Sequence, residues 1–287
     1  MISSLSDRYP VRWLCRLLMV SSSGYYAWLN RTPSRREREN EELSLAIRQI
    51  DREVNHCYGS PRMHAELNSR GYRCGRHRVA RLMRENGITV RRRIKRPGNR
   101  FTDDRGKAPN LLNREFTVDR INRVWAADIT YIRTSQGFVY LAVVLDLYSR
   151  RVVGWAMRSR LGADLVSAAL RQALGQRQPA SGIIHHCDRD GLYASAAYQE
   201  LLAEHGFIIS NSRKGNCYDN ACVESFFARL KIECMYPKKF VNRAQAELDI
   251  FKYVEVFYNR VRRHSTLNYL SPIDYEIKNR QPCINVQ

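Results

Sequence analysis

Residues 124–157 read VWAADITYIRTSQGFVYLAVVLDLYSRRVVGWAM, which contains three apolar, β-branched segments separated by short polar stretches. The segments span residues 124–132, 138–145 and 152–157. Because they are short and closely spaced, they predict an antiparallel meander of three strands. Asp128 lies within the first predicted strand, where a carboxylate is costly unless a cation or a hydrogen-bond donor satisfies it.

Helical and strand patterns alternate after this meander. A helix is predicted over 163–176, a strand over 183–187, a helix over 196–205, a strand over 207–211, and helices through 224–231 and 248–258. This order is that of a ribonuclease H-like fold in the α/β (α+β) class, although order alone also permits other α/β folds. Trp125 and Tyr131, the aromatic neighbours of Asp128, are expected in the core.

The sequence before the meander is helical in pattern. Apolar residues at helical spacing on both sides of a polar break at residues 21–23 predict a helix-turn-helix-like segment over residues 1–32. An all-helical helix-turn-helix region is expected over 33–90, with Ser34 and Ser60 as N-caps. Residues 91–117 predict a basic linker, which leaves residues 118–280 for the α/β domain.

The composition is strongly basic. The 287 residues carry 48 Lys and Arg against 28 Asp and Glu, a net charge of +20, and 25 of the basic side chains lie within residues 1–117. Such an excess points to a polyanion partner, most commonly nucleic acid; a generally basic surface is the alternative. At 44% hydrophobic residues a wholly disordered chain is excluded, and no apolar run is long enough for a membrane span. Without signal-peptide features at the N-terminus, we expect a cytoplasmic protein with reduced cysteines.

Arginines gather at two places in the first half. Arg78, Arg81 and Arg84 share one face of the helix that is expected to end at Gly87, and we interpret this face as a DNA contact, with a solvated face as the alternative. The linker begins with Arg91, Arg92 and Arg93, which could lie along phosphates. His56, Cys57, His64, Cys74 and His77 lack the paired short spacings of a zinc site, so no zinc is expected.

Three carboxylates stand out in the second half. Besides Asp128, Asp188 follows the strand predicted over 183–187, and Glu224 lies in a predicted helix. Each alone would be interpreted as a surface or capping carboxylate. If they converge, their mutual repulsion requires a hard divalent cation, and oxygen ligands favour Mg²⁺, with Mn²⁺ as a substitute. Two such ions would activate a nucleophile and stabilise the leaving oxygen at phosphorus.

The segments around these acids resemble those of a known family. Asp128 in WAADITY and Asp188 in HCDR are similar to the first two acids of DDE transposases and retroviral-type integrases, and 35 residues separate Asp188 from Glu224, as in that family. The segment SRKGNCYDNACVESFF (212–227) resembles the third-acid motif of OrfB-type transposases of the insertion-sequence-three family. Tyr258-Asn259-Arg260, Arg263-His264-Ser265 and Leu270-Ser271-Pro272 are similar to its C-terminal block, and residues 58–62 with 81–87 to its second helix-turn-helix.

The resemblance implies Mg²⁺-dependent DNA strand cleavage and strand transfer at insertion-sequence ends, with Asp128, Asp188 and Glu224 as catalytic and metal-binding residues. Water nicks the element end, and the freed 3′-hydroxyl attacks another phosphodiester. The expected partners are double-stranded DNA at element ends and target, further copies of the chain on DNA, and an upstream-frame (OrfA-type) protein or fusion. The resemblance implies a bacterial protein associated with the nucleoid when it acts.

Further basic residues are expected to contact DNA. Arg213, Lys214 and Lys231 flank Glu224 and could hold the backbone near the metals, with ordinary surface charge as the alternative. Arg263 and His264 could contact phosphate, although His264 could equally interact with a helix dipole.

One departure from the family pattern falls beside the second acid. The family usually continues as Asp-Arg-Gly-x-Gln-Tyr, whereas this chain reads Asp188-Arg189-Asp190-Gly191-Leu192-Tyr193. A glycine at position 190 would permit positive φ, which Asp tolerates better than most residues, and Asp190 adds a second negative charge. Weakened catalysis is therefore expected. A non-catalytic DNA-binding relative is the alternative function, and a nuclease acting on RNA–DNA hybrids is disfavoured by the helical N-terminal half.

Overall fold

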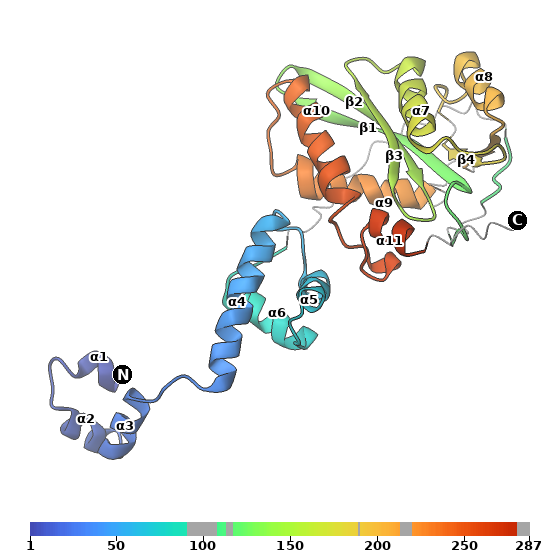
Figure 1. Cartoon of the computed structure of the whole chain (residues 1–287). Helices are drawn as coiled ribbons and strands as arrows, with labels where there is room; N and C mark the ends of the chain where they lie inside the picture. Colours follow the sequence, from blue (N-terminus) through green and yellow to red (C-terminus); the bar gives the residue numbers. More distant parts are fainter. Residues whose placement is uncertain (91–107, 113–116, 189, 213–219, 280–287) are drawn as a thin grey trace, which may run out of the picture.

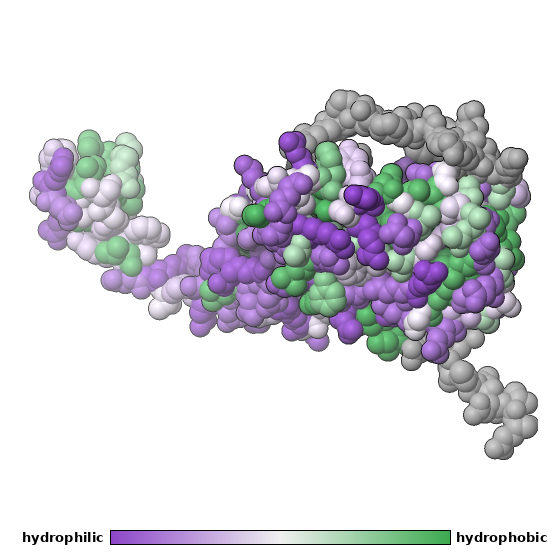
Figure 2. Space-filling model, turned by 90° about the horizontal axis from the view of Figure 1, so that it is seen from above, coloured by the Kyte–Doolittle hydropathy of each residue, from purple (hydrophilic) through white to green (hydrophobic). Residues whose placement is uncertain are grey.

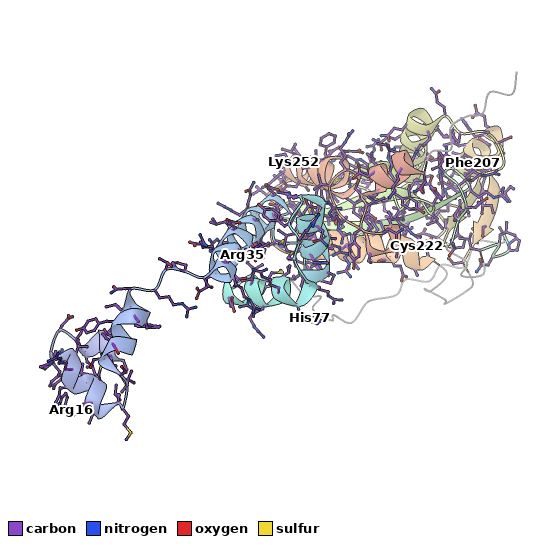
Figure 3. The ribbon with its side chains drawn as sticks, turned by 60° about the horizontal axis from the view of Figure 1, so that its bottom comes forward. Arg16, Arg35, His77, Phe207, Cys222 and Lys252 are labelled. Atoms are coloured by element: carbon purple, nitrogen blue, oxygen red, sulfur yellow. The ribbon has the colours of Figure 1, made fainter. Side chains whose placement is uncertain are left out.

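The computed structural model describes residues 1–90, 108–112, 117–188, 190–212 and 220–279. Three parts follow one another along the chain (Figure 1). The first is a small helical unit of α1 (Ile2–Leu5), α2 (Val11–Leu17) and α3 (Ser22–Leu29). The second comprises α4 (Arg35–Glu53), α5 (Ser60–Ser69) and α6 (Arg76–Glu85), and it lies between the first unit and the α/β domain in Figures 1 and 3.

A five-stranded mixed sheet forms the centre of the α/β domain. Its strands are β1 (Val124–Thr134), β2 (Gly137–Asp146), β3 (Val152–Arg158), β4 (Ile184–Cys187) and β5 (Ile208–Asn211), in the order β3-β2-β1-β4-β5. β1, β2 and β3 pair antiparallel, which confirms the predicted meander. β4 and β5 add in parallel beside β1, so β1 is the central strand and has neighbours of both orientations.

Helices cover both faces of the sheet (Figure 1). One face packs α7 (Ala163–Arg177) and α8 (Ala196–Glu204) against Trp125 and Ala127. On the other face, α9 (Ala221–Leu230) and α10 (Arg243–Phe251) pack against Ala126 and Ile132. The helix α9 continues as the π-helical η2 (Lys231–Met235), and α10 continues as the π-helical η3 (Lys252–Tyr258). The chain then passes through η4 (Ser265–Leu267) to α11 (Pro272–Lys278). Successive residues of β1 alternate between the two cores, as a strand buried on both faces requires.

The helix-turn-helix region has its own core. Ile47, Ile50, Met63, Leu67 and Val79 are fully buried where α4, α5 and α6 meet. The predicted cap at Ser34 is confirmed, because its hydroxyl accepts the N–H of Glu37 while the Glu37 carboxylate accepts the N–H of Ser34. The N-cap predicted at Ser60 is wrong by one residue: Gly59 holds that position, and Pro61 lies within the first turn.

The core position predicted for Tyr131 is wrong, whereas that of Trp125 is confirmed. Trp125 is fully buried, but 61% of Tyr131 is exposed, and its ring packs edge-on against the exposed Phe138 at 5.5 Å between centroids. Near the C-terminal end of β1, the face of the sheet that carries Tyr131 is exposed to solvent. Among the described residues, no helix is long and apolar enough to span a membrane.

The contact between β3 and α7 leaves no room for a side chain at Gly154. A Cβ there would lie 2.2 Å from the Ala169 carbonyl oxygen and 2.8 Å from the Ala173 Cβ. Gly154→Ala should therefore lower the free energy of unfolding by about 1–3 kcal/mol. Gly175→Ala is the matched control, because nothing lies within 4 Å of a Cβ at Gly175 in α7. In this control the free energy of unfolding should rise by about 0.5–1 kcal/mol. Equal urea unfolding midpoints for the two variants would contradict the packing argument.

Candidate active site

The parallel pairing of β1 with β4 brings two of the predicted acids together. Ala126 pairs with His186, so the same register, continued by two residues, sets Asp188 beside Asp128. Adjacent strands lie about 4.8 Å apart, and residues two apart point to the same face. Both carboxylates are partly buried, at the face of the sheet on which α9 packs.

The surroundings of both carboxylates raise their pKa. Burial raises the pKa of Asp128 well above its ordinary value, and the charges of Asp188 and Glu224 raise it further. A hydrogen bond from the Ile129 N–H at 2.7 Å and the charge of Lys231 act in the opposite direction. The pKa of Asp188 is raised to about 6, mainly by burial. These acids therefore attract protons or cations from the solvent.

Glu224 approaches the pair from α9. Its side chain is exposed, and its charge is close enough to raise the pKa of Asp128. The start of α9 is tied to the central strand, because the Asn220 side-chain amide donates to the Ala127 carbonyl at 3.2 Å. Asn220 is buried and lies immediately before the helix, so this bond fixes the helix start beside Asp128.

The donor set suits a hard divalent cation, but the structure does not bring the acids together as a finished metal site. Within the described residues, no three His, Cys, Asp or Glu side chains are close enough to one another to hold an ion. Like charges oppose the closer approach of three carboxylates, and a divalent cation removes that opposition. Oxygen donors from a strand, a strand end and an adjacent helix are the type of ligand that Mg²⁺ takes.

A buried histidine braces the strand that ends at Asp188. His186 on β4 hydrogen-bonds through Nδ1 to the Ser210 hydroxyl at 2.9 Å and through Nε2 to the Ser212 hydroxyl at 3.2 Å. All three side chains are buried, and the Ser212 N–H donates to the Cys187 carbonyl at 3.0 Å. The bonds join the ends of β4 and β5. Sequence reasoning missed this group, for which the only signal was a polar side chain beside the acid.

Asp190 shapes the turn after Asp188 in a way that differs from the expectation. Its φ is not positive, so the backbone at this position does not use the left-handed conformation that a glycine would permit. Instead, its carboxylate accepts the Leu192 N–H at 3.0 Å, while its own N–H donates to Asp188 at 3.1 Å. The charge of Asp190 also raises the pKa of Asp188, so the departure both orders the turn and adds negative charge.

The predicted DNA-contacting residues of the first half fall into two groups. Arg78 pairs with Glu39 at 3.2 Å and donates to Asn40 at 2.8 Å, and Arg81 pairs with Glu85 at 2.8 Å, so both are held within the helical region. Arg84 is exposed. Arg91, Arg92 and Arg93, like Arg213 and Lys214 further on, lie outside the described residues.

Lys231 is a predicted basic residue that lies close enough to act on Asp128. Its ammonium group sits 5.8 Å from the centroid of the Tyr131 ring, within cation–π distance. Its charge lowers the pKa of Asp128, so it also contributes positive potential at the carboxylates.

Arg263 and His264 lie at an internal contact, not on the surface. Arg263 pairs with Glu66 of α5 and donates to the Tyr269 carbonyl at 2.8 Å. Only 9% of His264 is exposed, and burial together with neighbouring arginines holds its pKa well below the ordinary value. The phosphate contact expected of these two side chains therefore does not match their positions, because Arg263 is paired with α5 and His264 is buried beside Tyr258 and Arg262.

Asn259 of the C-terminal block also has a structural role that the sequence did not reveal. The fully buried Asn259 side chain accepts the Val152 N–H and donates to the Val152 carbonyl, both at 3.0 Å, so it extends the hydrogen bonding of β3. Figure 3 marks Cys222 on α9, two residues before Glu224, where its sulfur accepts a hydrogen bond from Arg150 and it packs against the core.

Comparison with known families supports the division seen in the fold. Residues 118–217 match the integrase core domain family, residues 224–279 match a second integrase core domain family, and residues 37–96 match an HTH-like domain. The matches cover all three acids and the helices α4 to α6.

Several curated proteins are similar over almost the whole chain. Transposase InsF for insertion sequence IS3A of Escherichia coli K12 is 40% identical over 274 residues, which cover 94% of this chain and 95% of the relative. An uncharacterised 31 kDa protein of insertion element IS600 from Shigella sonnei is 40% identical over 271 residues, 93% of this chain and 99% of the relative.

Solved structures show more distant likeness. A chain of the simian T-cell lymphotropic virus intasome with a PP2A regulatory subunit is 16% identical with a TM-score of 0.46, covering 76% of this chain and 72% of that one. The HTLV-2 integrase catalytic core domain in complex with magnesium is 14% identical with a TM-score of 0.40, covering 54% of this chain and 96% of that one.

The raised pKa of Asp188 predicts how stability varies with pH. Below the pKa that Asp188 has in the unfolded chain, near 3.8, its raised folded pKa does not affect the free energy of unfolding. That free energy falls as the pH rises through the folded pKa, about 6. In EDTA, Asp188→Asn should therefore raise the Tm at pH 8 by about 2–5 °C and leave it nearly unchanged at pH 4. The exposed Asp119→Asn, as control, should change neither. A lower Tm for Asp188→Asn at pH 8 would show that the carboxylate stabilises the fold.

The Asn220 bond predicts a role in cation binding. Asn220→Ala should weaken binding of Mg²⁺ or Mn²⁺ about tenfold, because it frees the start of α9 from β1. The control is Asn242→Ala, which removes the N-cap of α10 and should cost about 1 kcal/mol of stability without changing cation affinity. Isothermal titration would measure both, and equal affinities in the two variants would exclude the positioning role.

Proposed function

The chain belongs to the IS3 family of transposases, and we propose that it cuts and joins DNA strands at insertion-sequence ends in a reaction that requires Mg²⁺. Transposition through an integrase core is the activity that the family membership supports. The observation that carries the finer proposal is the position of Asp128 beside Asp188, where burial and the charges of Asp188 and Glu224 raise the pKa of Asp128 well above its ordinary value. A cation bound there would relieve this cost, and carboxylates perturbed in this way are candidates for functional residues.

The chemistry divides between the acids and the basic groups. Asp128, Asp188 and Glu224 would hold Mg²⁺, with Mn²⁺ able to replace it, and the bound ions would supply activation of the attacking oxygen and stabilisation of the leaving one. Asp128 is oriented for this by the Ile129 N–H, and the end of β4 that carries Asp188 by the brace of His186. Lys231 adds positive charge where a DNA phosphate would approach.

The other parts of the chain would bind DNA. We propose residues 33–90 as the helix-turn-helix region, residues 91–117 as a basic linker along the backbone, and residues 118–280 as the catalytic domain. Arg84, Arg91, Arg92, Arg93, Arg213 and Lys214 are the proposed backbone contacts. The chain would act as an oligomer on DNA, since two element ends must be processed together. A catalytically inactive DNA-binding relative is the alternative, and the presence of all three acids favours the enzyme.

The first test separates catalysis from binding. Alanine at Asp128, Asp188 or Glu224 should lower Mg²⁺-dependent nicking and joining of an end substrate about a thousandfold or more, because the cation ligands are lost. DNA affinity should stay within about threefold of the parent, because basic groups supply it. Glu200→Ala, at an exposed acid of α8, should keep full activity. Strand transfer at the parental rate by Glu224→Ala would refute the assignment.

The exposed apolar side chains of the N-terminal unit support the proposal of a partner protein. Only Leu14, Cys15 and Tyr25 are buried in it, whereas Trp13 is 51% and Trp28 62% exposed. Figure 2 shows apolar side chains on its visible face, and about thirty residues are too few to bury a core of their own. We propose that the upstream-frame (OrfA-type) product covers these side chains, as a partner or in a fusion.

This proposal predicts a gain of specificity on fusion. The isolated chain should bind element-end and scrambled duplexes with similar affinity, and fusion to the upstream-frame product should favour the end at least tenfold in gel-shift competition. Trp13→Ser with Trp28→Ser should abolish that preference in the fusion, since both aromatic surfaces are lost. Tight, end-specific binding by the isolated chain would contradict the need for a partner.

A further inference from the structure

A small pocket lies where the helix-turn-helix region meets the α/β domain. It is lined by His56, Cys57, Arg62, Val90, Arg229, Ile232 and Glu233. The first four come from the helix-turn-helix region and the last three from α9 and η2, so the pocket exists only because the two parts dock. It is separate from the acids, although α9 contributes to both.

The docking contact fixes one side of the pocket. The Arg62 Nε donates to the Arg263 carbonyl at 2.8 Å, and the Tyr58 hydroxyl donates to the Val261 carbonyl at 3.1 Å and accepts the Arg263 N–H at 2.9 Å. The Arg62 side chain is therefore held in place before any ligand arrives, which reduces the entropy lost on binding.

The carboxylate in the pocket is already neutralised. Glu233 accepts two hydrogen bonds from the buried Arg262, at 2.6 and 2.7 Å, and a third from the Tyr253 hydroxyl at 2.8 Å. Within the part of the chain that the structure describes, neither Arg62 nor Arg229 forms an ion pair with a carboxylate. Two guanidinium groups from different parts of the chain thus line the pocket, and the Glu233 carboxylate beside them already has Arg262 as its ion-pair partner.

The surroundings of Arg62 favour an anion. Burial lowers the pKa of Arg62 and the charges of Arg262 and Arg229 lower it further, while the charge of Glu233 acts in the opposite direction. Burial and the charges of Arg262, Arg62, Arg150 and Arg229 keep the nearby His264 neutral. Protonated arginines that repel one another at a partly buried site are stabilised by an anion between them.

We propose that this pocket binds a backbone phosphate of duplex DNA, with Arg62 from α5 and Arg229 from α9 as the donors. Guanidinium groups match the non-bridging oxygens of a phosphate in pairs, and the contact carries no base information. The inference rests on the proposed function, which supplies DNA as the polyanion. Arg229 follows Glu224 by five residues on one helix, so their Cα atoms are about 7.5 Å apart along the helix axis.

The salt dependence of DNA affinity tests the proposal. The full chain and its variants are titrated into a labelled duplex of about 20 base pairs by fluorescence anisotropy, without divalent cations, from 50 to 300 mM NaCl. Arg229→Gln should reduce the slope of log K against log[salt] by about 0.9, the value for one lost phosphate contact. Arg171→Gln, on an exposed position of α7, removes the same charge away from the pocket and should leave the slope unchanged. Arg229→Lys should restore the slope but only part of the affinity.

The outcomes separate the two proposals. Equal slopes for Arg229→Gln and Arg171→Gln would overturn the phosphate pocket and leave the transposase assignment standing. A parent chain that does not bind the duplex would overturn the assignment itself. Thermal stabilisation by inorganic phosphate that Arg229→Gln abolishes, with an unchanged DNA slope, would show that the pocket takes a small anion and would overturn DNA as its ligand.

Discussion

The placement of a carboxylate in the central strand constrains the rest of the domain. Asp128 lies on β1, which has a neighbour on each side and a helix layer on each face, so its charge has little access to water. The parallel partner strand adds Asp188 beside it, and α9 adds Glu224. A fold that contains this repulsion must hold its backbone firmly at these positions, and the two-sided core around β1 does so.

The sequence predicted those features that are encoded by neighbours along the chain. Alternation and β-branching located the three meander strands, and the helical caps and apolar periodicity located α4 and α7. Asp128 and Asp188 stood out because a charged residue in or beside an apolar strand is unusual, whereas Glu224 was identified by its spacing and its resemblance to the family motif. The exposed position of Tyr131 could not be predicted, since an aromatic residue in a strand is normally buried and only the extent of the covering helices decides otherwise.

Contacts between distant residues had no local signal. The bond of His186 to Ser210 spans 24 residues, the Arg262–Glu233 pair spans 29, and the contact of Arg263 with Glu66 spans 197. Arginine and histidine in a basic segment are usually exposed, so sequence reasoning assigned Arg263 and His264 to DNA. Both are enclosed instead, and the hydrogen bonds of Arg263 join the C-terminal segment to the helix-turn-helix region.

The docking of the two parts makes α9 the element on which opposite charges converge. Its first turn carries Glu224 towards two other acids, and its last turn carries Arg229 towards Arg62. Each end is unfavourable alone, because like charges repel at partly buried sites. In the proposed reaction a cation would relieve one end and a DNA phosphate the other. The position of this helix would then depend on cation and DNA together, which would link the helix-turn-helix region to the acids through one helix.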